Sequence, residues 1–173
     1  MISIEIAIDD KQIQKFFKDS PKKAEWAMKE ALSMAGGHIR KELKTYVETQ
    51  TEGMKPLHPV TLKGRSGGPA PLHNISKWVS FKYSRRGTTQ QVQIGWIGSQ
   101  GKTSIIKKLF YGKRFRATDK IRALFHRRGV HLRESTKMLE VPKRPALDAF
   151  WAKKSREIPA YVKQRFLEKF DTK

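Results

Sequence analysis

The sequence contains no cysteine, which removes a large group of functions at the outset. Thiol catalysis, cysteine-ligated zinc and disulfide cross-links are excluded, and the composition fits a protein made in a reducing cytosol. Long hydrophobic runs are also missing, since no stretch approaches the roughly 20 apolar residues that a membrane-spanning helix needs. Met1 leads into alternating residues with early acids, so we expect neither a signal peptide nor a membrane anchor.

Acidic residues are absent from the middle of the chain. None lies between Gly53 and Thr118, and from Gly53 to Arg133 there are 18 Lys and Arg with Asp119 as the single acid. That region therefore carries +17 of a total formal charge of +21, while the two ends are nearly balanced. Such a field attracts nucleic acid, anionic surfaces or acidic proteins, and charge alone does not choose among them.

Groups that would support catalysis or metal binding do not converge in the sequence. The five histidines show no spacing such as HExxH, and His126 and His131 flank two arginines whose field disfavours a bound cation. Paired-carboxylate chemistry would have to borrow acids from the chain ends. The sequence GKTS at 101–104 suggests a phosphate-binding loop, but Trp96 stands where that motif requires its first glycine. We therefore expect a protein that is not an enzyme and holds no metal or cofactor.

What is present is the pattern of one α+β domain over residues 1–173. We expect a small antiparallel or mixed sheet packed against one long helix and a C-terminal helix, with a long loop as an arm. Isoleucines alternate through residues 1–8, as in a strand with one buried face, and a short helix to Lys18 follows. Ser20 and Pro21 then signal a long helix that continues to Val47.

Two adjacent glycines interrupt the pattern of the long helix. Gly36 and Gly37 should each cost about 1 kcal/mol relative to alanine in an exposed helix. Close packing against a strand would offset that cost, and a kink is the alternative.

The segment 49–74 loses periodicity and collects four glycines and four prolines. A loop of this length is usually functional or disordered, so we expect an extended loop or arm. It is either a surface excursion or a subunit clasp that orders against a neighbouring copy. The apolar residues that could anchor the clasp are Met54, Leu57, Val60, Leu62 and Leu72.

Two strands, 79–83 and 92–96, follow as an antiparallel hairpin with Arg85, Arg86 and Gly87 at its turn. Aromatic residues beside these arginines could stack on bases, but cross-strand core pairs are commoner at this spacing. Thr103 or Ser104 then suits the start of a short helix closed by Gly112.

Residues 119–147, DKIRALFHRRGVHLRESTKMLEVPKRPAL, indicate a helix stopped at Gly129, a basic connector, a short strand at 138–141 and a turn into a helix. Pro142 and Pro145 frame that turn because each fixes its φ angle, and Pro145 suits the first position of the next helix. Arg144 between them is expected to hold a carboxylate or carbonyl group, with a surface role as the alternative.

Taken in order, these segments resemble the tail-completion, or virion morphogenesis, proteins of tailed bacteriophages. The likeness rests on MKPLHPVTLKGRSGGPAPL at 54–72, QVQIGW at 91–96 and KIRALFHRRGVHLR with LEVPKRPAL within 120–147. Met54 and Lys55 stand where those proteins usually carry a tryptophan. The resemblance implies a structural virion protein at the neck or upper tail, made in the host cytoplasm, that completes the tail or joins it to the head.

The resemblance also implies partners. They would be other copies in a hexameric ring and neighbouring neck, connector, tail-terminator or tail-tube proteins, with genomic DNA in the lumen as a further contact and no membrane. The alternative function is a free nucleic-acid-binding protein that uses a central basic belt. Either would use the same candidate contacts: Arg85, Arg86, Lys107, Lys108, Lys113, Arg114, Arg116, Arg127 and Arg128.

Overall fold

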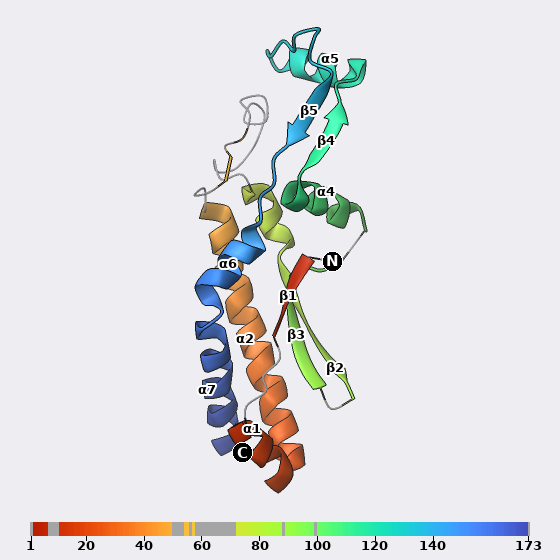
Figure 1. The fold of residues 1–173 in the computed structure, drawn as a ribbon. Helices are drawn as coiled ribbons and strands as arrows, with labels where there is room; N and C mark the ends of the chain where they lie inside the picture. Colours follow the sequence, from red (N-terminus) through yellow and green to blue (C-terminus); the bar gives the residue numbers. More distant parts are fainter. Residues whose placement is uncertain are drawn as a thin grey trace.

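Figure 1 shows a computed structural model of the chain, which describes residues 2–6, 11–49, 54–55, 57, 72–87, 89–98 and 100–172. The expected α+β class is confirmed, because helices accompany one three-stranded and one two-stranded antiparallel sheet. Within the part of the chain that is described, none of the helices combines the length and apolarity needed to cross a bilayer.

Helix α2 (Pro21–Thr49) is the axis of the body. Pro21 occupies its first position, where a missing amide hydrogen does little harm. Its buried residues recur every three to four positions and include Ala24, Ala27, Ala31 and Ala35, all with 0% exposure. Such small side chains let neighbouring elements approach closely, so the sheet packs on one side of α2 and helix α7 (Glu157–Asp171) on another.

The larger sheet has the strand order β1-β3-β2, with β3 (Thr89–Trp96) in the centre. Strand β1 (Ile2–Ile6) and strand β2 (Ser80–Arg86) both pair antiparallel with it, and the 3-10 helix η1 (His73–Trp78) leads into β2. Val92, Ile94 and Trp96 alternate along β3 and are buried, and the antiparallel pairing of β2 with β3 confirms the predicted hairpin. Trp96 donates its Nε1–H to the carbonyl oxygen of Ile75 at 2.8 Å, so it is a core residue.

The two adjacent glycines of α2, Gly36 and Gly37, have different surroundings. A Cβ atom at Gly36 would lie 2.6 Å from Phe81 Cδ2 and 2.8 Å from Val92 Cγ2, so the backbone of α2 meets the sheet directly there. Close packing is therefore confirmed for Gly36. A Cβ at Gly37 would meet nothing within 4 Å, and packing does not explain that residue.

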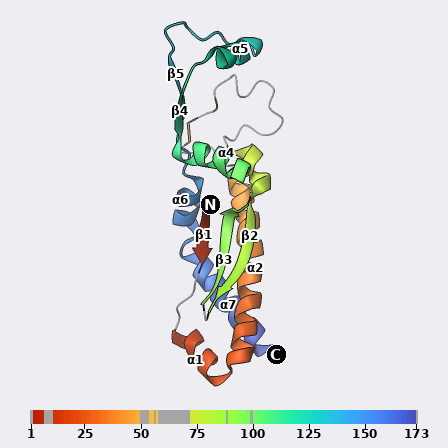
Figure 2. The same ribbon diagram turned by 90° about the vertical axis from the view of Figure 1, so that its right-hand side faces the viewer.

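Short helix α1 (Lys11–Asp19) closes the lower end of the body (Figures 1 and 2). The ring of Phe16 lies 4.5 Å from that of Phe170 and 5.7 Å from that of Phe166, both on α7. Phe166 itself is fully buried. The first helix and the last therefore share one aromatic cluster.

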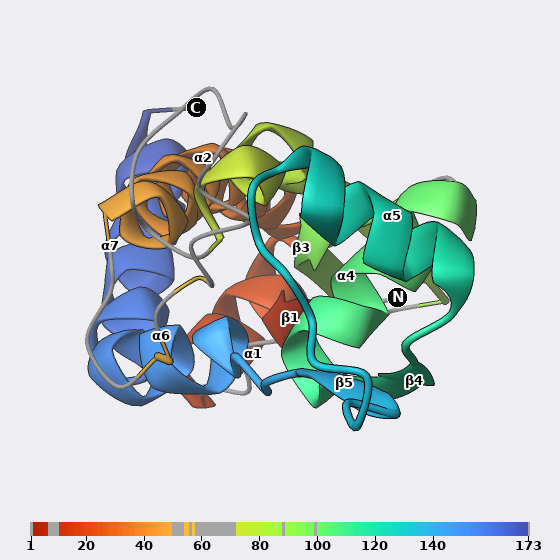
Figure 3. The ribbon, with the colours of Figure 1, turned by 90° about the horizontal axis from the view of Figure 1, so that it is seen from above.

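The second half of the chain builds the other end of the molecule. Helix α4 (Gln100–Tyr111) is followed by β4 (Lys113–Arg116), α5 (Asp119–Arg127) and β5 (Met138–Val141), and β4 pairs with β5 in a separate sheet. Helix α6 (Ala146–Lys154) begins one residue after Pro145 and returns the chain to the body. Seen from above (Figure 3), α2, α6 and α7 lie to one side, with α4 and α5 over the strands.

Candidate interaction surface

Residues 112–143 form a unit that extends away from the body, and we call it the projection (Figures 1 and 2). Its ribbon consists of four cross-strand pairs, among them Arg114 opposite Glu140 and Phe115 opposite Leu139. An isolated two-stranded ribbon is marginally stable in water and usually needs a further layer to pack on. The projection therefore requires support from other contacts.

Helix α5 does not supply a core to the projection. The sequence places Ile121, Leu124 and Phe125 on one face, yet no residue of α5 is buried. Leu124 is 40% exposed, and Met138 on β5 is 51% exposed. The apolar face of α5 thus remains only half covered within the described chain.

An arginine that sequence analysis did not single out fixes α5 to its connector. The guanidinium of Arg122 donates to the carbonyl oxygens of Arg133 at 3.0 Å, Glu134 at 3.2 Å and Thr136 at 2.6 Å. Nothing in the sequence distinguishes Arg122 from its basic neighbours, because the three carbonyls converge only through the path of the connector. This clamp joins helix α5 to the connector through three hydrogen bonds.

The turn after α5 agrees with the predicted glycine stop. Gly129 has a φ of +72°, the left-handed conformation in which glycine is favoured. On either side of this glycine, the rings of His126 and His131 meet edge to face with their centroids 4.6 Å apart. In the described part of the chain, no group of three His, Cys, Asp or Glu residues is arranged to hold a metal ion.

The base of the projection contains the proline-framed motif. Arg144 is 3% exposed and donates from Nη1 to the carbonyl oxygen of Pro142 at 3.3 Å and from Nη2 to that of Lys55 at 3.5 Å. Its backbone N–H donates to the carbonyl oxygen of Leu109 at 3.1 Å. Carbonyl partners and burial favour a structural role for Arg144, with Pro142 half-buried and Pro145 exposed beside it.

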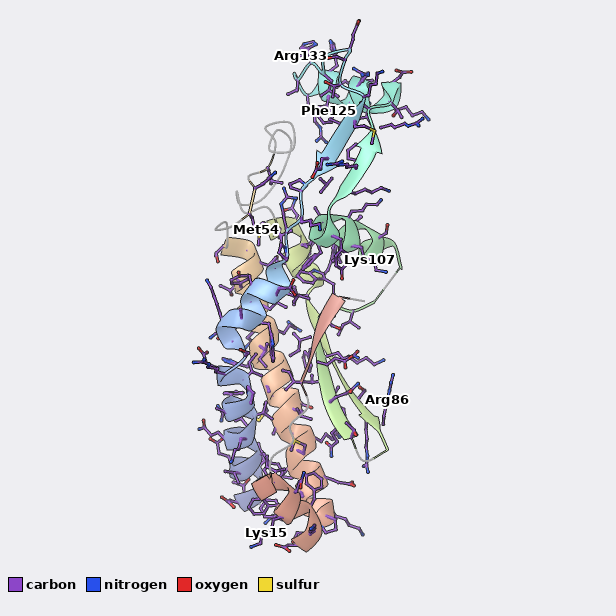
Figure 4. The ribbon with its side chains drawn as sticks, viewed as in Figure 1. Lys15, Met54, Arg86, Lys107, Phe125 and Arg133 are labelled. Carbon is purple, nitrogen blue, oxygen red and sulfur yellow. The ribbon has the colours of Figure 1, made fainter. Side chains whose placement is uncertain are left out.

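The nine candidate contact residues do not form one belt. Arg86 lies at the turn end of the β2–β3 hairpin, whereas Lys107 is on α4 (Figure 4). Arg85 is engaged by a two-pronged ion pair with Glu25, with N···O distances of 2.9 and 2.8 Å. The seven others lie together on α4 and the projection: Lys107, Lys108, Lys113, Arg114, Arg116, Arg127 and Arg128.

Most of this positive charge on α4 and the projection is not neutralised. Arg114 forms an ion pair with Glu140 at 3.3 Å, but both side chains are more than half exposed, and such pairs contribute little. The described residues offer no ion-pair partner to the exposed side chains of Lys107, Lys108, Lys113, Arg116 and Arg127.

The proposed clasp residues have different surroundings. Leu72 is 1% exposed in the core of its own chain, so the prediction that it could anchor a clasp on a neighbour is wrong. The side chain of Leu72 is packed inside the core beside η1. Met54 and Leu57 are half-buried, and Met54 packs against the same core. Val60 and Leu62, like most of 49–74, lie outside the described residues, while Thr49 belongs to α2 and His73 to η1.

A hollow of about 370 Å³ lies between α2 and α7 and is lined by His38, Glu42, Lys154 and Glu157, among others. Lys154 Nζ lies 3.1 Å from a carboxylate oxygen of Glu42 and 2.6 Å from one of Glu157. The hydrogen bonds to Glu157 and Glu42 raise the pKa of Lys154, which keeps its amine protonated. These groups satisfy one another and do not present a reactive lysine.

Comparisons with protein-family models, with curated proteins and with solved structures found no match to this chain.

Proposed function

We propose that this chain is a structural assembly protein of a tailed-bacteriophage particle. In that role it completes the tail or joins it to the head at the neck, as one subunit of a hexameric ring. The order of the segments at 54–72, 91–96 and 120–147 supports the proposal, since it resembles the order in tail-completion proteins. Its neighbours would be other copies and the adjoining neck or tail proteins.

The observation that carries the proposal is the incomplete packing of the projection. The body has a continuous apolar core, but α5 buries no residue, and Leu124 and Met138 remain exposed. Exposed large apolar residues beside arginines are typical of protein interfaces. A subunit that receives a neighbour on the projection would complete this packing.

Assembly and joining can be tested together. The purified chain is weighed by light scattering and imaged by negative-stain electron microscopy, and then added to an extract of a phage that lacks it. We expect rings, and an increase in complete particles after addition. A chain that stays monomeric at micromolar concentration and leaves heads and tails unjoined would contradict the proposal and favour the free nucleic-acid-binding alternative.

A further inference from the structure

Positive charge is distributed differently over the body and the projection. In the body, some bases are paired with acids: Arg85 with Glu25, Lys154 with Glu42, and Arg165 with Glu168 at 2.7 Å. Residues 112–143 contain ten Lys and Arg but three acids, and the ion pair of Arg114 with Glu140 is between two exposed side chains. Self-repulsion therefore concentrates in the projection and would be relieved by an external polyanion.

The positions of these bases suit a ligand charged along its whole length. Arg114 and Arg116 lie on one face of β4, because they are two residues apart and side chains alternate along a strand. Further bases follow on α5, with Lys120 and Arg127, and at Arg133 in the connector. The Arg122 clamp holds α5 and the connector together, so this array is ordered before any ligand binds.

Beside the apolar contact proposed above for a neighbouring subunit, the basic residues of the projection favour a nucleic acid over an acidic protein as a further ligand. Lysine is depleted at protein–protein interfaces, yet four of the ten bases in 112–143 are lysines, and α4 adds the exposed pair Lys107 and Lys108. Phosphate groups bind the side chains of both lysine and arginine. Binding to single strands relies on exposed aromatic rings, and Tyr111 is the only aromatic among the large exposed apolar residues of the described chain. A duplex therefore fits better.

We propose that the projection and the adjoining helix α4 bind the phosphate backbone of double-stranded DNA without regard to base sequence. The inference deepens the proposed assembly role, on which it rests for the source of the duplex. Phosphate contacts release condensed counterions, so binding should weaken steeply as salt rises.

The test uses the whole chain and a labelled duplex of about 30 base pairs, titrated between about 50 and 200 mM salt. We expect the triple variant Lys120→Gln, Arg127→Gln, Arg133→Gln to lower the slope of log K against log salt by about one for each phosphate that the protein no longer neutralises. A second variant, Lys107→Gln, Lys108→Gln, Lys113→Gln, should lower it too and preserves the test if the first fails to fold.

The matched control removes three charges from the body. Lys15 and Lys18 on α1 and Lys82 on β2 are exposed, and Lys15 lies at the far end from the projection (Figure 4). Replacing all three with glutamine should leave the salt slope unchanged. An equal loss of slope in the control and projection variants would mean diffuse attraction and would overturn the inference.

Two other outcomes would also overturn it. One is no binding by the full chain at the lowest salt. The other is displacement of the duplex by polyglutamate at equal charge, which would assign the surface to an acidic protein. Ring formation is measured on the same samples without DNA. Rings without DNA binding would reject this inference alone, and DNA binding without rings would reject the assembly role alone.

Discussion

At Gly36, helix α2 touches the sheet through its backbone. A side chain there would overlap Phe81 and Val92, which are fixed by strand pairing. The conformational cost of glycine is thus offset by contact between helix and sheet. Two glycines in an otherwise periodic helix predict either close packing or a kink, and the sequence does not show which of the two glycines meets the sheet.

The two glycines offer a matched pair of substitutions. Gly36→Ala should destabilise the protein by about 1–3 kcal/mol, because the overpacking outweighs the gain in helix propensity. Gly37→Ala should stabilise it by up to about 1 kcal/mol, since the added methyl group meets nothing. Urea unfolding followed by circular dichroism measures both, and equal effects at the two sites would contradict the packing argument.

At the scale of elements, strong apolar periodicity makes the helices and strands of the body predictable. Part of the projection lacks such periodicity and could not be predicted. The long helix α2, the β2–β3 hairpin and β5 follow clear apolar patterns. Strand β4 is not predicted from the sequence, because KRFR contains a single apolar residue. It is a strand because β5, more than 20 residues later, pairs with it. Such a distant partner leaves no local signal.

Arg122 provides a prediction for α5 and its connector. Arg122→Gln removes most of the donors that hold three connector carbonyls, so local opening of residues 128–137 should increase. Trypsin should then cleave at Arg133 faster by several-fold, while the melting temperature of the body changes little. Lys120→Gln, on the same helix and without an ion pair among the described residues, is the control and should leave that cleavage rate unchanged.

At the scale of the whole molecule, charge along the sequence was a poor guide to charge in space. Residues 53–133 form one acid-poor band in the sequence, yet the chain carries Arg85 and Arg86 to the β2–β3 turn, away from α4 and the projection (Figure 4). The net charge of a segment does not show in which direction a hairpin carries its charged residues. The fold class was predictable, whereas the division of the basic residues into separate surfaces required the fold.

Assembly supplies a prediction at this scale. The double variant Leu124→Gln, Met138→Gln should shift the chain from rings to smaller species, because it makes the uncovered apolar surface of the projection polar. Met34→Gln on α2 is the matched control, since Met34 is 38% exposed but lies on the body. Light scattering at equal protein concentration compares the variants, and loss of rings in the control alone would assign the subunit contact to α2.

The base of the projection has a consequence for how such a molecule could change. A Cβ atom at Gly112 would lie 2.9 Å from the carbonyl oxygen of Val141 and 3.3 Å from the backbone nitrogen of Lys143, so the chain leaves and re-enters the body at almost one point. The projection is therefore joined to the body by two chain segments that lie side by side. Natural variation could lengthen, shorten or replace the projection and so adapt the molecule to a new partner, while the core of the body keeps its structure.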